Sequence, residues 1–440
     1  MLKITFLGAG STVFARNVLG DCMSSEALRE CEIALYDIDA VRLKESEKIL
    51  CAINKGKGGY SKISCYAGVD NLEKALEGAS FAVNAVQVGG YDPATIADFE
   101  IPKKYGLRQT IGDTLGIGGI MRALRTIPVM EMFAKKMEKV CPDAWLLNYT
   151  NPMSMLTGYI QTYTNVKTVG LCHSVQVCSE HLLNSLGLGG KLEGRKELIA
   201  GINHMGWLLE IRDKNNIDLY PEIKKRAKEK NASEKHWDMV RYDYIDKLGY
   251  YCTESSEHNA EYNPFYIKSK YPDLTGRFNI PLDEYPRRCI EQIEGWKAEY
   301  GSLSKSETLE HNRSHEYASY IMESIVTGTP YKIGGNVLNT GGSIENLPKE
   351  ACVEVPCLVD NSGIRACHAG KLPVQLAAMN MTHINVHLIT MEAAFTKKRE
   401  NIYHAAMMDP HTAAELSLDD IRSMTDELLE AHKVWLPEYK

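Results

Sequence analysis

The chain has 440 residues, of which 44% are hydrophobic and 24% are charged, a balance typical of globular proteins. Its formal net charge of -7 at pH 7 provides no basic surface, so we expect neither nucleic acid nor an anionic membrane as a partner. No apolar run approaches the ~20 residues of a membrane span, and no signal-peptide pattern follows the first residue.

Twelve cysteines are spread along the chain without the regular spacing of a disulfide framework. A chain of this length does not need disulfides to stabilise its core. We therefore expect reduced thiols and a cytoplasmic protein.

The first part of the chain alternates short apolar strands with amphipathic helices. The expected strands are residues 3–7, 32–36, 61–66, 80–86, 144–147 and 167–171, and the expected helices are 11–22, 42–53, 71–76 and 120–139. Strands that alternate with helices at this spacing predict a parallel, doubly wound α/β sheet.

The pattern changes after residue 195. Apolar stretches typical of β structure occupy 198–211, amphipathic helices are expected at 291–300, 314–325, 372–396 and 418–432, and loops at 275–285 and 339–347. We predict two domains, 1–195 and 196–440, of which the second mixes α and β structure.

The turn after the first strand has the pattern of a dinucleotide site. Gly8 and Gly10 stand between the strand and a helix, where glycine permits a tight turn and close approach of the backbone to a pyrophosphate. Ser11 is placed to cap the helix, and Thr12 follows it. Val13 replaces the third glycine of the motif.

Acidic residues close the second strand, where a carboxylate would bind ribose hydroxyls. Asp37 is the first choice and Asp39 the alternative. Their negative charge favours NAD over NADP, although Arg42 lies nearby. The predicted cofactor-binding residues are therefore Gly8, Gly10, Ser11, Thr12, Asp37 and Arg42.

A cysteine and a histidine suggest a catalytic metal. Cys172 follows the strand 167–171, at the carboxyl end where open sheets bind ligands, and His204 lies in an apolar stretch. A thiolate and an imidazole suit Mn, Ni, Co or Zn. Two protein ligands leave positions open for substrate, as catalysis requires. The alternative for each residue is a packed place in the core.

Other polar groups stand near these two residues in the sequence. His173 can act as a general acid, and Asn151 offers an amide to sugar hydroxyls. The glycine-rich segment 112–119, which includes Asp113, predicts a flexible loop before a helix. The segment 250–262 is rich in titratable groups without helical periodicity, and its plainer interpretation is a solvated loop.

Taken together, these motifs resemble glycoside hydrolase family 4, the NAD- and manganese-dependent glycosidases. The resemblance covers essentially the whole chain and includes residues 8–12 (GAGST), 116–119 (GIGG), 148–152 (NYTNP), 170–174 (GLCHS), 201–204 (GINH) and 409–412 (DPHT). Residues 172–175 (CHSV), 253–258 (TESSEH) and 282–286 (LDEYP) resemble the α-galactosidase, or melibiase, branch, whereas the branches that act on 6-phosphorylated glycosides carry Asp or Asn after the cysteine.

The resemblance implies an N-terminal Rossmann-like domain of the lactate/malate dehydrogenase type and a C-terminal substrate and oligomerisation domain. It implies roles for seven residues: Cys172 and His204 as metal ligands, His173 as leaving-group acid, Tyr262 as base, and Asn151, Arg288 and Asp113 as substrate residues. Tyr266 is the alternative base, and Arg287 the alternative arginine.

The resemblance also implies an unusual hydrolysis of terminal α-galactosides such as melibiose or raffinose. NAD takes a hydride from C3 of the sugar, a tyrosinate removes the C2 proton, and the aglycone leaves from C1. Water then adds, and the hydride returns to C3, so the cofactor is regenerated and the configuration at C1 is retained. The expected cofactors are NAD and Mn²⁺ or another divalent metal, and the expected assembly is a homodimer or homotetramer.

Three alternatives remain open at this point. The chain could be another family 4 glycosidase, an α-glucosidase or an α-galacturonidase. It could be a lactate/malate-type dehydrogenase, which would accumulate NADH with a hydroxy acid. It could also be an inactive NAD-binding sensor, which would bind NAD without turning over a glycoside.

Overall fold

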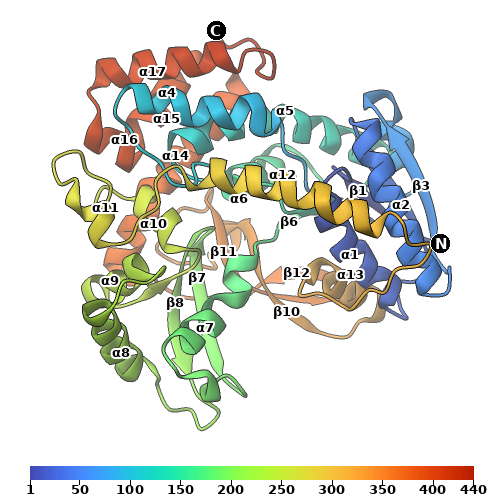
Figure 1. Ribbon diagram of the computed structural model, residues 1–440, viewed down its shortest axis with the longest axis horizontal. Coiled ribbons are helices and arrows are strands. Elements are labelled where there is room, and N and C mark those ends of the chain that lie inside the picture. Colours follow the sequence, from blue (N-terminus) through green and yellow to red (C-terminus); the bar gives the residue numbers. More distant parts are fainter.

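A computed structural model describes residues 1–440, and one twelve-stranded sheet runs through the whole molecule (Figure 1). Eleven strands follow each other in the order β3-β2-β1-β4-β5-β6-β10-β11-β7-β8-β9, and β12 pairs with β11. The order reverses between β3-β2-β1 and β4-β5-β6, which is the switch point at which open α/β sheets bind ligands.

The first six strands are parallel, as the sequence predicts. They are β1 (Leu2–Leu7), β2 (Cys31–Asp37), β3 (Lys62–Ala67), β4 (Phe81–Asn84), β5 (Trp145–Asn148) and β6 (Lys167–Gly170). The helices that follow them are α1 (Thr12–Ser24), α2 (Ala40–Gly56), α3 (Leu72–Leu76), α4 (Ile96–Lys104), α5 (Gly116–Val140), α6 (Met153–Tyr163) and α7 (His173–Ser185). Because these strands are parallel, their carboxyl ends lie at one edge of the sheet.

The remaining strands extend the same sheet in antiparallel fashion. They are β7 (Lys196–Ile202), β8 (Met205–Arg212), β9 (Tyr251–Cys252), β10 (Tyr331–Leu338), β11 (Cys352–Asp360) and β12 (Gly363–Ala366). The proposed domain boundary at 195/196 falls just before β7, and the sheet crosses it without a break. The division into two domains therefore stays a prediction.

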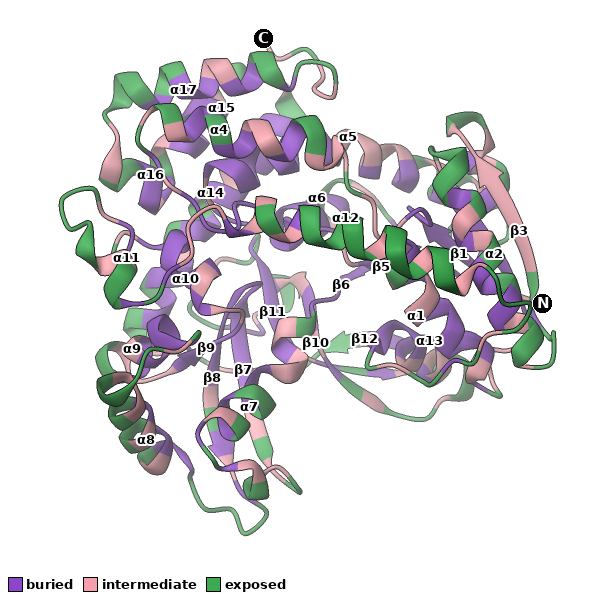
Figure 2. Ribbon diagram, in the orientation of Figure 1, coloured by how far each residue is buried: buried purple, intermediate pink, exposed green.

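Ten further helices surround this second part. They are α8 (Tyr220–Ser233), α9 (Met239–Leu248), α10 (Ser256–Tyr262), α11 (Asp273–Arg277), α12 (Glu284–Leu303), α13 (Tyr317–Thr327), α14 (Val374–Thr396), α15 (Arg399–Met408), α16 (Pro410–Glu415) and α17 (Leu418–Ala431). Figure 2 shows the burial: α8 and α12 are largely exposed, whereas the central strands are buried. No helix combines the length and the hydrophobicity needed to cross a bilayer.

Helix α12 crosses the face of the molecule from α10 toward α1 and α2 (Figure 1). At its beginning, Arg288 pairs with Glu257 at 2.9 Å. In its second half, the Trp296 indole donates to Glu45 of α2 at 3.1 Å. The helix therefore connects the two parts of the chain without burying much of its own surface, since only Glu284 and Cys289 are buried in it.

A single row of backbone pairs joins the parallel strands to the antiparallel ones. Gly170 of β6 pairs with Asn336 of β10, Asn336 pairs with Glu354 of β11, and Glu354 pairs with Gly201 of β7. The Asn336 amide donates to Glu354 at 3.0 Å and to the Gly170 carbonyl at 3.3 Å. Both side chains are fully buried, so these hydrogen bonds are shielded from water and stabilise the junction.

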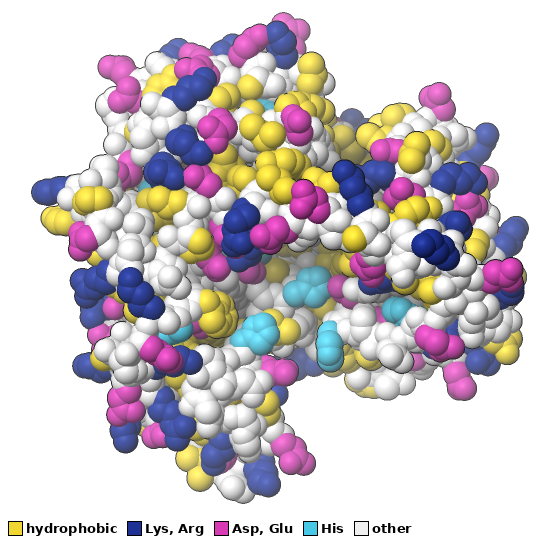
Figure 3. Space-filling model, viewed as in Figure 1, with side chains coloured by type: hydrophobic (Ala, Val, Ile, Leu, Met, Phe, Trp, Pro, Cys, Tyr) yellow, Lys and Arg dark blue, Asp and Glu magenta, His cyan; other side chains and the backbone are white.

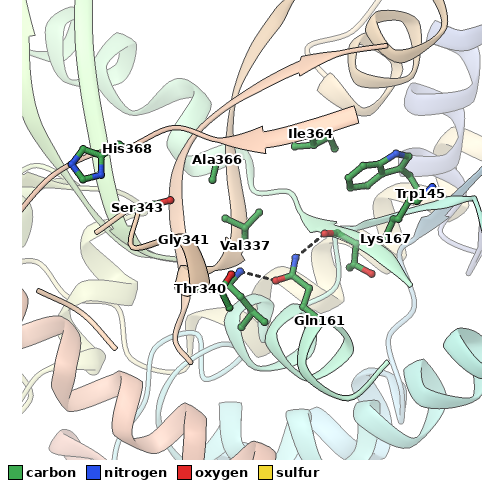
Figure 4. A pocket seen from close by; sticks show the side chains of 12 residues that line it. Trp145, Gln161, Lys167, Val337, Thr340, Gly341, Ser343, Ile364, Ala366 and His368 are labelled. Carbon is green, nitrogen blue, oxygen red and sulfur yellow. Dashed lines mark hydrogen bonds between the residues drawn. The ribbon is translucent and has the colours of Figure 1, made fainter. Parts of the chain in front are cut away.

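A cavity of about 510 Å³ lies beside the same junction (Figure 4). Its lining includes Trp145 and Lys167, the first residues of β5 and β6, so it lies at the edge of the sheet opposite the Gly8 turn. Gln161 of α6 donates to the Thr168 carbonyl and accepts from the Leu338 amide, both at 2.7 Å. Figure 4 shows this amide bridging the two strands.

Three sequence-based expectations about local structure are wrong. Residues 116–119 begin helix α5, so only the first part of the glycine-rich segment 112–119 is a loop. The segment 250–262 is not a solvated loop, because it forms β9 and α10 and is mostly buried. The expected loop 275–285 overlaps α11 and the start of α12.

A buried ion pair fixes the helices behind the site. Asp98 of α4 accepts two hydrogen bonds from Arg125 of α5, at 2.6 and 3.2 Å, and lies 2.7 Å from the ring of His432. The side chain of Arg125 is fully buried. Its Nε donates to the Val88 carbonyl, and the Gln109 amide donates to the Asp98 carbonyl, so the pair also holds two loops near the site.

We expect Asp98→Ala to lower the free energy of unfolding by roughly 3–5 kcal/mol, because it leaves the buried Arg125 without its partner. Urea unfolding at fixed protein concentration measures this change. Glu100→Ala on the same helix is the control: this side chain is 59% exposed, and its loss is expected to cost less than about 0.5 kcal/mol. A cost below about 1 kcal/mol for Asp98→Ala would contradict the assignment.

Candidate functional site

The Gly8–Gly10 turn sits at the carboxyl end of β1 and at the start of α1. Gly8 has φ +88°, and a Cβ there would lie 3.0 Å from the backbone of Ala85. A Cβ on Gly10 would lie 2.7 Å from the Asp37 carboxylate. Both positions therefore require glycine, and the helix N-terminus behind them has the geometry that accepts a phosphate group.

Asp37 and Asp39 have different tasks. Asp37 accepts from the Gly10 amide at 2.6 Å and so ties the glycine turn to the end of β2. Asp39 caps α2 by accepting from the amides of Val41 and Arg42. Of the two, Asp37 lies beside the turn, as a ribose ligand must.

Two neighbouring hydroxyl groups differ in what they contact. The Thr12 side chain is buried and bonds to Ser46 at 2.7 Å, and its role as a cofactor-binding residue stays a prediction. Ser11 occupies the N-cap position of α1, but its side chain makes no capping hydrogen bond. Only Ser11 keeps a hydroxyl available to a ligand at this turn.

Cys172 and His204 come together, as the sequence predicts. Cys172 follows β6 and is the N-cap residue of α7, and its Sγ lies 3.1 Å from Ser174 Oγ. His204 lies in the two-residue turn between β7 and β8, with φ +64°. Asn203 beside it donates to the buried Glu354 at 3.3 Å, which links this hairpin to the row that crosses the sheet.

A third donor completes the cluster. One ligand atom each from Cys172, His204 and Glu254 lies within 4.8 Å of the others. Glu254 Oε2 is 3.4 Å from His204 Nε2, and Glu254 also has a positive φ, +68°. Thiolate, imidazole and carboxylate at this spacing form a donor set that fits a borderline divalent cation.

Asp113, His204 and His258 form a second group of the same kind. Asp113, predicted as a substrate residue, lies 3.9 Å from His258, next to the metal donors. The loop before it is held by Glu261 of α10, which accepts from the amides of residues 110, 111 and 112 at 2.7 to 3.1 Å. Helix α10 therefore carries His258 and, through Glu261, holds the loop that precedes Asp113.

The charges in this cluster balance one another. Burial opposes the charged form of His204, but Glu254 and Cys172 outweigh it and raise the pKa of His204 to about 10. Burial also opposes the charge on Glu254, yet His204 and His258 lower its pKa to about 2. A concentrated negative charge that draws a proton to this degree is also what attracts a metal cation.

Tyr262 points into the cluster. Its hydroxyl lies 2.9 Å from His204 Nδ1, and its side chain is fully buried. Burial first, and then the charges of Asp113 and Glu261, raise the pKa of Tyr262 well above its ordinary value. Tyr266, the alternative base, does not reach the cluster, because its hydroxyl donates to Asp243 at 3.0 Å.

His173 is the first residue of α7 and lies beside Cys172. Its Nε2 lies 2.6 Å from Glu316 Oε2, and the Tyr149 ring packs against its ring at a centroid distance of 5.6 Å. Burial opposes the charged ring, but the hydrogen bond to Glu316 raises the pKa of His173 above its ordinary value. An imidazole that is hydrogen-bonded to a carboxylate and partly open to solvent has the geometry of a general acid.

The other predicted substrate residues differ in their hydrogen-bond partners. The Asn151 side-chain oxygen is buried and has no hydrogen-bond partner, so it is free to bind a ligand. Arg288 pairs with Glu257 and Glu284 at the start of α12, and Arg287 pairs with Glu284 and Glu291. Neither arginine contacts the metal donors, and their role stays a prediction.

The sequence did not single out Glu254, His258 or Glu316. The first two lie in the polar segment 253–258, where the density of titratable groups was the available signal. Glu316 stands directly before an apolar helix, next to His315 and Arg313. No motif marked this stretch, so nothing in the sequence connected Glu316 with His173.

Figure 3 shows that the face crossed by α12 is hollowed at its centre, and histidine side chains gather around this hollow. A hollow with titratable side chains at its rim has features of an active site.

Two family models match the chain: "Family 4 glycosyl hydrolase" over residues 3–188 and "Family 4 glycosyl hydrolase C-terminal domain" over residues 199–412. An α-galactosidase of Bacillus subtilis is 58% identical over 440 residues, which is the full length of both proteins. An α-galactosidase of Rhizobium meliloti is 34% identical and covers 99% of this chain and 89% of the relative.

Among solved structures, a 6-phospho-α-glucosidase from gut microorganisms, in complex with NAD and Mn²⁺, superposes with a TM-score of 0.82. It covers the full length of both chains at 20% identity, so it supports the fold alone. The glycine turn, the Cys172–His204 pair and the two family models agree with one another. The chain is a glycosidase and belongs to family 4 of the glycosyl hydrolases.

Proposed function

We propose that the chain is an α-galactosidase that hydrolyses terminal α-galactosides of the melibiose and raffinose type. Hydrolysis would proceed by oxidation at C3, elimination, addition of water and re-reduction, with NAD and a divalent metal such as Mn²⁺ as cofactors. The observation that carries the proposal is the 58% identity, over the full length, with an α-galactosidase. Residues 172–175 (CHSV), which lack the Asp or Asn of the phosphoglycoside branches, support it.

The residues present fit both cofactors. Gly8 and Gly10 leave no room for a Cβ, and Asp37 stands beside them, as a dinucleotide site requires. Cys172, His204 and Glu254 bring three donors within 4.8 Å, and the buried Asn151 oxygen lacks a partner. When bound, NAD supplies a hydride acceptor and the metal supplies a Lewis acid.

The side chains of the protein would divide the proton transfers between two sides of the sugar. Tyr262 would accept the proton from C2, and His173 would give a proton to the oxygen that leaves from C1. Tyr262 belongs to α10 and His173 to α7, so the two groups come from separate helices. The Asn151 amide would orient the sugar hydroxyls.

The proposal also includes the partners of the protein. We expect a small carbohydrate as the ligand and a homodimer or homotetramer as the assembly, with neither nucleic acid nor a membrane as a partner. The cytoplasm is the proposed location, because twelve cysteines remain unpaired.

A panel of nitrophenyl α- and β-glycosides, together with melibiose and raffinose, tests the function. We expect the highest kcat/KM with α-galactosides, a requirement for NAD and Mn²⁺, and no net NADH. Full activity after dialysis and chelation would contradict cofactor dependence. A higher kcat/KM for an α-galacturonide or a 6-phosphoglycoside would contradict the substrate, and NADH accumulation with a hydroxy acid would indicate a dehydrogenase.

Changing a metal donor should remove the metal without removing NAD. We expect Cys172→Ser and His204→Ala to lower Mn²⁺ affinity by more than the ~10–100-fold that outer-shell changes cause. Metal content after dialysis and NAD binding by fluorescence measure the two effects, and Glu254→Gln tests the third donor. Cys51→Ser, at an exposed cysteine, is the control. Unchanged metal content in both main variants would exclude the site.

The role of Tyr262 can be measured independently of product formation. We expect Tyr262→Phe to lower turnover by at least about 10²-fold and to abolish deuterium incorporation at C2 in heavy water. NAD and Mn²⁺ binding should persist. Tyr266→Phe is the matched control, because its hydroxyl bonds to Asp243 outside the cluster. Normal exchange at C2 in Tyr262→Phe would place the base elsewhere.

A further inference from the structure

Three consecutive residues at the start of α13 hold the turn that carries Cys172 and His173. Glu316 Oε2 lies 2.6 Å from His173 Nε2. The Tyr317 hydroxyl donates to the Cys172 carbonyl at 2.9 Å, and the Ala318 amide donates to the hydroxyl of Tyr149 at 3.0 Å. A segment more than 140 residues away in the chain thus contacts the turn, its histidine and the ring beside that histidine.

Hydrogen bonds to α1 anchor the backbone that carries Glu316. Glu316 is the N-cap residue of α13 and is only 8% exposed. Its amide donates to Ser314 Oγ at 3.1 Å, and Ser314 donates to the fully buried Asp21 through both its amide and its hydroxyl. Asp21 also bonds to the His311 ring at 2.7 Å, so the segment before α13 is anchored to α1.

The His173 ring is constrained on its face as well as at Nε2. Tyr149 packs against it with the ring planes at 32°, and Tyr317 and Phe14 meet it edge-on at 87° and 88°. Half of the side chain nevertheless stays exposed. The His173 ring bonds to the protein through Nε2 and Glu316. Its other nitrogen, Nδ1, is therefore available to a substrate.

We propose that Glu316 is a positioning residue for His173, and this inference rests on the proposed function. With Nε2–H directed at the carboxylate, the Nδ1 proton is the one that His173 gives away. As the C1–O bond breaks, its electron pair goes to the aglycone oxygen, which takes that proton. The ring is left neutral, with Nε2–H still bonded to Glu316, so no tautomer change is needed.

Poor and good leaving groups separate this role from a structural one. Methyl α-galactoside and melibiose release an aglycone that needs a proton, whereas 2,4-dinitrophenyl α-galactoside releases one that does not. We expect Glu316→Ala and Glu316→Gln, loaded with NAD and Mn²⁺, to lose roughly 10–100-fold in kcat/KM on the first two substrates. On the dinitrophenyl substrate we expect a loss of less than about threefold.

Three comparisons make the test decisive. Glu316→Gln preserves side-chain size if Glu316→Ala fails to fold, and Glu323→Gln on the same helix should leave every substrate unaffected. The double variant Glu316→Gln/His173→Gln should depend on the leaving group no more strongly than His173→Gln alone. A uniform loss on all substrates would overturn the inference alone. A wild-type enzyme that hydrolyses no α-galactoside would overturn the proposed function and the inference with it.

Discussion

The row of backbone pairs that runs from Gly170 through Asn336 and Glu354 to Gly201 is the constraint on which the site depends. It is the connection between the parallel strands, which carry the nucleotide turn and Cys172, and the hairpin that carries His204. Cys172 and His204 lie only two and three residues beyond the ends of this row. Their approach is therefore set by the sheet and not by flexible loops.

Glycine at both ends of this row reflects how closely neighbouring groups approach its backbone. A Cβ on Gly170 would lie 2.5 Å from the sulfur of Met153, and a Cβ on Gly201 would lie 2.5 Å from the Met205 carbonyl. Between them, burial raises the pKa of Glu354 to about 7 despite the amides of Asn336 and Asn203. This buried carboxyl on β11 accepts from an amide on β10 and from an amide in the β7–β8 turn, so it connects the two sides of the row.

The sequence was most informative where one strand, its turn and its following helix form a single local unit. The Gly8 turn, Asp37 and Cys172 all belong to such βα units, and each lies at the carboxyl end of its strand in the structure. The donors Glu254 and His258 could not be assigned, because their segment reads as polar and irregular until β9 and α10 are seen to be buried. Their spacing becomes meaningful only when the hairpin of His204 packs against them.

Glu316 and Thr12 show two different limits of sequence reasoning: a contact that no motif marks, and a motif residue whose side chain is used in the core. Glu316 reaches His173 through a contact between distant segments, which no local pattern encodes. Thr12 stands in a motif that suggests a ligand, yet its hydroxyl bonds to Ser46 in the core. In both cases tertiary packing decides which polar groups are free, and the sequence specifies only which ones exist.

The positive φ angles of His204 and Glu254 have a consequence for protein engineering. Each costs on the order of 1 kcal/mol or more for a residue other than glycine or asparagine, and both residues belong to the proposed metal site. A search for stabilising substitutions would therefore select Gly or Asn at positions 204 and 254. Such a search would yield a more heat-resistant protein with a dismantled site, so these two positions must be held fixed in any effort to make this enzyme more robust.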